Sequence, residues 1–168
     1  MLLAIDLAGN FSLGNAIIAG LIGGVAMLPV IYSGRAIGMT RMDLLKTLGT
    51  MLMPRAEANR AYVVGLMVHL MMSAGFGVVH AGLLHAFDPS STGAATGLGV
   101  LFGALHGLLV TMVMPMMLKM RHPLVKSGEM NDPGPFMTGM GKMTPMGMVM
   151  GHVAFAVVAG AVYASLAG

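Results

Sequence analysis

Histidine and methionine are the residue types in this 168-residue sequence best suited to chemistry. Five of the six histidines lie inside long apolar stretches, namely His69, His80, His85, His106 and His152, and the sixth, His122, lies near the start of the connection that follows the third stretch. Ionisable residues within apolar, membrane-spanning segments are rare and mark functional sites by default. The histidines are therefore the first candidates for a binding site.

Three of these histidines are expected in one layer. A helix rises about 1.5 Å per residue, so His69, His152 and His106 lie ~12, ~10 and ~18 Å from the basic ends of their stretches. His80 lies about three turns beyond His69 on the same helix face. Three separate helices therefore bring an imidazole to a similar depth.

Methionine is distributed on one side of this layer. Every methionine except Met1 lies within residues 27–72 or 112–150. Thioethers and imidazoles without thiolates form a soft ligand set that suits Cu(I) better than Zn²⁺, Mg²⁺ or Ca²⁺. We therefore predict a Cu(I) site whose ligands are His69, His106, His152, Met67, Met72, Met112 and Met148.

Other interpretations of the same residues stay open. Methionine also fills irregular gaps between helices. An intramembrane histidine can simply form a hydrogen bond with a carbonyl or a Ser/Thr side chain on a neighbouring helix. Small residues flank His80 in VVHAG and His106 in GALHG, which would leave room for a haem or a (bacterio)chlorophyll with these histidines as axial ligands. At His122-Pro123 a helix stop is favoured over a ligand.

The residues for catalysis are missing, so we expect no enzyme. The sequence has no cysteine, which excludes thiolate metal sites and cysteine nucleophiles. All six acidic residues lie outside the apolar stretches, namely Asp6, Asp43, Glu57, Asp88, Glu129 and Asp132. No carboxylate is thus placed to orient a histidine base beside Ser73.

The elements that must position these residues are membrane-spanning helices. The sequence is 57% hydrophobic and only 9% charged, whereas soluble domains carry about 25% charged residues. Four stretches have the length of about 20 residues that a bilayer requires, at 14–33, 61–87, 95–118 and 145–166. The length fits one domain, so we predict an all-α, integral membrane four-helix bundle over residues 1–168.

The basic residues predict the orientation of the bundle. All nine fall in the two connections 34–60 and 119–144, namely Arg35, Arg41, Lys46, Arg55, Arg60, Lys119, Arg121, Lys126 and Lys142. The positive-inside rule places both connections in the cytoplasm and both termini outside. The expected location is the bacterial inner membrane, with the first thirteen residues retained as an interfacial segment because no basic n-region or cleavage site is present.

The connections and the glycines refine this picture. Thr40 or Asp43 can cap an amphipathic interfacial helix that ends at Pro54 and carries Leu44, Leu48, Met51 and Leu52 on one face. The second connection is rich in Gly and Pro and is expected to be irregular. Glycines recur at small-xxx-small spacing, which predicts close packing of helices. These faces involve Gly20, Gly24, Gly99, Gly103, Gly107, Gly147 and Gly151.

The C-terminal part contains the segments GLLVTMVMPMM, RHPLVKSGEMNDPGPF and TPMGMVMGHVAFAVVAG. They resemble a family of small, uncharacterised four-span bacterial inner-membrane proteins. The resemblance covers mainly residues 95–168 and, more weakly, the segment MDLLKTLG. It implies an inner-membrane location, with His106, His122-Pro123 and His152 matching positions of that family, and it implies no activity.

The sequence thus predicts a non-catalytic membrane protein that binds Cu(I). An accessory subunit of a larger respiratory, photosynthetic or oxygenase complex is the alternative, with a haem or (bacterio)chlorophyll held by histidine. A small oligomeric transporter is third. The expected partners are the lipid bilayer and either other membrane subunits or further copies of the chain, whereas no nucleic acid is expected, because the positive charge is explained by topology.

Overall fold

The computed structural model describes residues 11–167, except for the side chains of Thr92 and Ala167. The described residues form helices and no strand, which confirms the predicted all-α class. The elements are α1 (Leu13–Ala36), α2 (Leu44–Leu52), α3 (Ala58–Phe87), α4 (Thr92–Arg121), α5 (Pro123–Lys126), the 3₁₀ helix η1 (Pro135–Met140) and α6 (Thr144–Ala167). Four of them, α1, α3, α4 and α6, are long and apolar enough to cross a membrane, as predicted.

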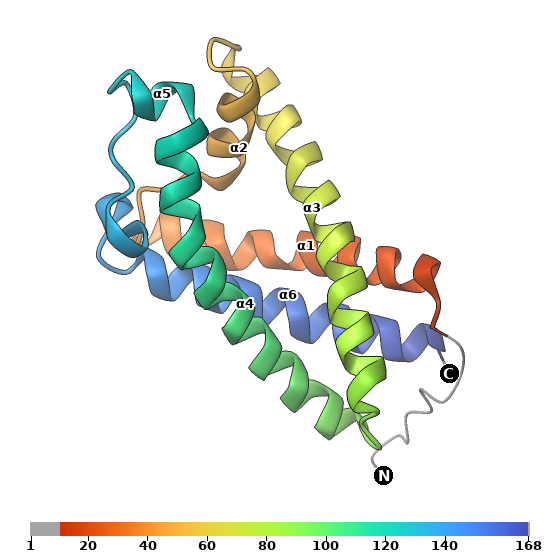
Figure 1. The fold of residues 1–168 in the computed structure, drawn as a ribbon. Helices are drawn as coiled ribbons and strands as arrows, with labels where there is room; N and C mark the ends of the chain where they lie inside the picture. Colours follow the sequence, from red (N-terminus) through yellow and green to blue (C-terminus); the bar gives the residue numbers. More distant parts are fainter. Residues whose placement is uncertain (1–10, 168) are drawn as a thin grey trace.

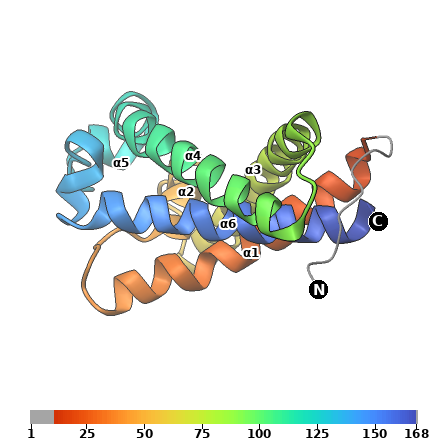
Figure 2. The same ribbon diagram turned by 90° about the horizontal axis from the view of Figure 1, so that it is seen from below.

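The four long helices form two layers (Figure 1). Helices α1 and α6 run antiparallel side by side, while α3 packs across α1 and α4 packs across α6. Helices α3 and α4 are close at the turn that joins them and then diverge, as Figures 1 and 2 show. We call the end with the 88–91 turn the turn end, and the end with α2, α5 and η1 the loop end.

Glycines allow the layers to touch backbone to backbone. A Cβ atom on Gly20 would lie 2.7 Å from the Cα of Gly77, where α1 crosses α3. A Cβ on Gly103 would lie 2.7 Å from the carbonyl oxygen of His152, where α4 crosses α6. The predicted glycine faces therefore pack within one chain, with the exception of Gly147, whose Cβ position faces open space.

The carboxylate of Asp43 joins α1, α2 and α3 at the loop end. It caps α2 by accepting from the amide of Lys46 at 3.2 Å, and it accepts from Tyr32 Oη at 2.8 Å, from Arg35 Nη1 at 2.5 Å and from the hydroxyl of Tyr62. Burial by itself would raise the pKa of Asp43, but these donors together hold it below its ordinary value of 3.8. The carboxylate is therefore ionised and fully partnered.

Helix α2 is docked against the bundle. It was predicted as an interfacial helix with Leu44, Leu48, Met51 and Leu52 on one face; Leu44 and Leu48 are buried, but Leu52 is 60% exposed. The inward face instead includes Gly49, where an added Cβ would collide with the backbone of Ala61 on α3. A small residue thus decides which face of α2 turns inward.

The second connection is more structured than expected. Its Gly and Pro content indicated an irregular loop, yet it contains α5 and η1. Both elements are too short to produce a helical period: α5 is a single turn that begins at Pro123, and η1 contains Phe136 and Met137 with positive φ angles of 51° and 65°. Met137 is fully buried against the bundle.

Glycine packing leads to a first prediction. In Gly103→Ala the new Cβ must displace the backbone of α6 at His152 and Val153, both 2.7 Å away, so the variant should lose about 1–3 kcal/mol of stability. Gly97→Ala on the same helix meets no atom within 4 Å and should be neutral or slightly stabilising. Thermal unfolding in mild detergent measures both; equal melting temperatures would contradict the packing.

A second prediction concerns the stability of the folded chain at low pH. Because the pKa of Asp43 is lowered in the folded chain, its contribution is complete above pH 3.8 and falls as the pH drops through the lowered folded value. Asp43→Asn should cost about 1–3 kcal/mol at pH 7 and should remove this acid-dependent loss. The control is Asp132→Asn, which breaks an exposed pair with Lys119 and keeps an Oδ1 atom that can accept from the amide of Gly134, so it should change little. Unfolding midpoints from pH 3 to pH 7, on the scale of these pKa values, check the prediction.

Candidate metal centre

A cavity of about 260 Å³ lies where α3 and α4 diverge. All four long helices and α2 contribute to its wall, and its polar residues are three histidines and one serine. The potential ligands in the wall are His69, His106, His152, Met27, Met42, Met72, Met114, Met117 and Met148. The wall contains no carboxylate, so its donor atoms are imidazole nitrogens and thioether sulfurs.

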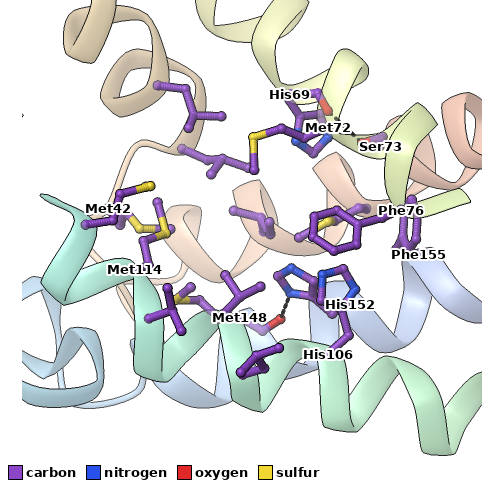
Figure 3. A pocket seen from close by; sticks show the side chains of 18 residues that line it. Met42, His69, Met72, Ser73, Phe76, His106, Met114, Met148, His152 and Phe155 are labelled. Atoms are coloured by element: carbon purple, nitrogen blue, oxygen red, sulfur yellow. Dashed lines mark hydrogen bonds between the residues drawn. The ribbon is translucent and has the colours of Figure 1, made fainter. Parts of the chain in front are cut away.

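His106 and His152 form the aromatic side of the cavity (Figure 3). Their ring centroids are 4.6 Å apart, and the ring of Phe76 lies 4.1 Å from that of His106. His106 belongs to α4 and His152 to α6, and Gly107 allows this approach, since a Cβ there would lie 3.1 Å from the Cβ of His152. The glycine contact between the helices thus also sets the spacing of the two imidazoles.

Backbone carbonyls assign the tautomers of two cavity histidines. His152 Nδ1 donates to the carbonyl of Met148 at 2.7 Å, and His69 Nε2 donates to the carbonyl of Gly24 at 3.0 Å. The other ring nitrogen, Nε2 of His152 and Nδ1 of His69, then carries a lone pair. A histidine that ligates a metal commonly donates its second nitrogen to a carbonyl in this way.

His106 has a ring nitrogen without a partner. Its Nδ1 lies 3.2 Å from Nε2 of His80, whereas its Nε2 is buried and has no hydrogen-bond partner among the described residues. Leaving a buried polar atom unpaired costs about 1–3 kcal/mol. Such an atom calls for an explanation, and the same holds for Nδ1 of His122, which is also buried without a partner among the described residues.

The structure brings together five of the seven predicted metal ligands. His69, His106, His152, Met72 and Met148 line the cavity, whereas Met67 and Met112 are 66% and 54% exposed on the outside of α3 and α4. Met67 lies two residues from His69, about 200° around the helix, while Met72 lies three residues away and shares its face. Helical spacing from His69 would therefore have shown that Met72 shares the face of His69 and that Met67 lies on the opposite side of the helix.

Four further methionines in the wall were not among the predicted ligands. Met117 follows His106 by eleven residues, about three whole turns, and Met114 follows it by eight residues, about 80° further around the helix, so both lie on the same side of α4 as His106. Met27 comes from α1, and Met42 precedes α2. Helix periodicity could have identified the first pair, but the position of Met42 depends on how the first connection folds back.

The three cavity histidines do not form one compact cluster. No three His, Asp or Glu side chains of the described residues are close enough together to hold a metal ion. His69 and Met72 lie on the side of the cavity opposite to His106 and His152 (Figure 3). Any site here combines imidazoles with thioethers rather than three imidazoles.

The proposed tetrapyrrole ligands His80 and His106 bond to each other. Their nitrogens are 3.2 Å apart, and the ring of Phe155 packs edge-on against His80 at 5.4 Å. In this arrangement His80 stands behind His106, outside the cavity wall. The two imidazoles therefore do not face each other across a space in which a tetrapyrrole could lie between them.

The last two histidines have structural surroundings. His85 packs edge-on against Phe11 at the turn end. His122 is fully buried, ends α4, and donates from Nε2 to the carbonyl of Thr47 on α2 at 3.0 Å. Burial lowers the pKa of His122, with this hydrogen bond opposing the shift. His122 is therefore the helix stop that was favoured, and it also connects α4 to α2.

Comparison of the chain with protein-family models, with curated proteins and with solved structures gives no match. The resemblance to small four-span inner-membrane proteins stays a prediction.

Proposed function

We propose that this protein is an integral membrane protein that binds Cu(I) in the cavity between α3 and α4. The observation that carries the proposal is the composition of the cavity wall, in which three imidazoles and six thioethers surround one space without a carboxylate. Soft, neutral donors of this kind favour Cu(I) over harder divalent ions. The protein would bind the ion and would not itself catalyse a reaction.

The ligands in this proposal are His106, His152 and a thioether. The two imidazoles already lie side by side, and the buried Nε2 of His106 lacks a partner. Met148 and Met72 supply sulfur from either side of the cavity. Methionine has three rotatable bonds, so its sulfur can move to an ion, with His69 as a further donor.

The size of the cavity favours a metal over a tetrapyrrole. Pockets that hold drug-sized ligands measure about 300–1,000 Å³, and this cavity, at about 260 Å³, lies below that range. A haem or (bacterio)chlorophyll would have to separate α3 from α4 and break the His80–His106 hydrogen bond. The accessory-subunit function with such a pigment is therefore the second candidate.

The proposed setting is a bacterial inner membrane, with both termini outside. This orientation is supported by charge, because every Lys and Arg lies at the loop end of the bundle and none at the turn end. The positive-inside rule assigns such an end to the cytoplasm. The cavity, whose wall includes Leu44 and Leu48 of α2, then lies nearer to the cytoplasmic side.

Labelling with a membrane-impermeant maleimide tests this orientation. The chain has no cysteine, so Ser90→Cys in the 88–91 turn and Ser127→Cys after α5 each introduce a single thiol at an exposed position. Ser90 is preferred to Ser91, whose hydroxyl caps α4. On intact cells Cys at 90 should be labelled and Cys at 127 should not, and the reverse pattern would invert the topology.

Competition with a chromogenic Cu(I) chelator tests the binding site. In detergent-solubilised protein, His106→Ala and His152→Ala should each weaken Cu(I) binding by at least about tenfold, the equivalent of 1.4 kcal/mol. Met72→Leu and Met148→Leu should have smaller effects, since neighbouring thioethers can substitute. The matched controls are Met67→Leu and Met112→Leu, which change outward-facing side chains on the same helices, and His85→Ala.

Two results would reject copper. Equal affinity in the wild type and in the triple variant His69→Ala/His106→Ala/His152→Ala would show that the cavity is not the site. A Soret band in the purified protein together with no bound copper would favour the tetrapyrrole-binding subunit instead.

A further inference from the structure

A second, much smaller cavity lies beside the first at the loop end. It is formed by the end of α1, the connection before α2 and the first turns of α6. Four methionines contribute to its wall, namely Met39, Met42, Met143 and Met148. Its volume is about 10 Å³, roughly the least that holds one water molecule. A single ion would fit this space, whereas an organic molecule would not.

The two cavities share part of their walls. Ile31, Met42 and Met148 line both. Met42 and Met148 are buried, with 3% and 4% exposure, whereas Met143 is 42% exposed and Met39 is half-buried. The thioethers thus form a series that begins at the protein surface and ends at the histidine-lined cavity.

The backbone around the small cavity is held by hydrogen bonds. The hydroxyls of Thr40 and Thr144 are 2.8 Å apart in buried surroundings, and the amide of Met42 donates to Thr40 Oγ1 at 3.1 Å. These bonds fasten the connection before α2 to the start of α6. Met39 and Met143, each one residue from a bonded threonine, are therefore held on two sides of one small space.

We propose that Met39 and Met143 form a Cu(I) entry site, from which Met42 and Met148 pass the ion to His106 and His152. The inference rests on the proposed function of the larger cavity. At each step one copper–sulfur bond forms as another breaks, and the last step replaces sulfur by imidazole nitrogen. Copper stays Cu(I) and no proton moves, because thioethers are neutral and do not titrate.

The charge around the path is consistent with a monovalent ion in neutral surroundings. No acidic side chain lines either cavity, so the path offers nothing that would hold Mg²⁺ or Ca²⁺. Entry from the loop end places the source of Cu(I) on the side of the basic connections. The physiological donor is then a cytoplasmic Cu(I) carrier if the orientation is as proposed.

The test measures how fast the full-length protein in detergent takes Cu(I) from a chromogenic Cu(I)–chelator complex. Met39→Leu/Met143→Leu should slow loading by at least about tenfold, equivalent to 1.36 kcal/mol in the barrier, while the equilibrium affinity of the histidine cavity stays within about twofold. The matched control is Met67→Leu/Met112→Leu, which also removes two thioethers and should load at the wild-type rate.

A second variant changes only the exposed end of the path. Met143→Leu alters one side chain that is 42% exposed and should slow loading in the same direction, by a smaller factor than the double variant. This single variant keeps the proposal testable if the double methionine variant fails to fold.

The outcomes separate the two proposals. Wild-type loading rates in both Met39→Leu/Met143→Leu and Met143→Leu would overturn the entry site while the histidine cavity remains a Cu(I) site. Equal slowing in the Met67→Leu/Met112→Leu control would also overturn it, because the effect would then not depend on this path. Absence of Cu(I) binding in the wild type would overturn both proposals.

Discussion

Backbone contact at glycines determines where the long helices cross, and the cavity follows from those crossings. Helix α3 touches α1 at Gly20 and Gly77, and α4 touches α6 at Gly103, so each outer helix is fixed to the inner layer and hardly to the other outer helix. Packing is the main source of association between helices in lipid. Two helices that meet at their shared turn and cross different partners must diverge, and the space between them is the candidate site.

Because α3 and α4 diverge towards the loop end, another element must cover the core there. Helix α2 is that element, held by Asp43 on one side and by His122 on the other. The side chains of Asp43 and His122 are themselves buried, and α2 also contributes Leu44 and Leu48 to the cavity wall. The carboxylate of Asp43 and the imidazole of His122 thus hold α2, and with it Leu44 and Leu48, in place at the loop end of the cavity.

The hydrophobic pattern of the sequence was sufficient to predict the four spans, because a bilayer imposes length and apolarity directly on each segment. The site was predicted in part. Depth along each stretch identified His69, His106 and His152, but depth calculated from helical rise assumes parallel helices, and α3 and α4 diverge. His69 therefore lies across the cavity from the other two, while His80 reaches His106. Such contacts depend on crossing angles that no single segment encodes.

The two ends of the bundle also explain the one-sided use of methionine. The core at the turn end, where helices are close, is built mainly from alanine, including Ala16, Ala19, Ala81 and Ala95. The core at the loop end, where they diverge, contains Met27, Met42, Met114, Met137, Met140 and Met148, and long flexible side chains suit such irregular gaps. Packing alone thus accounts for methionine at this end. It does not account for the three imidazoles that line the same cavity as the six thioethers, because a gap between apolar helices can be filled without ionisable side chains, and such side chains within spans are costly. The imidazoles of His106 and His152, with ring centroids 4.6 Å apart in a wall that contains no carboxylate, are what distinguish a candidate binding site from a loosely packed core.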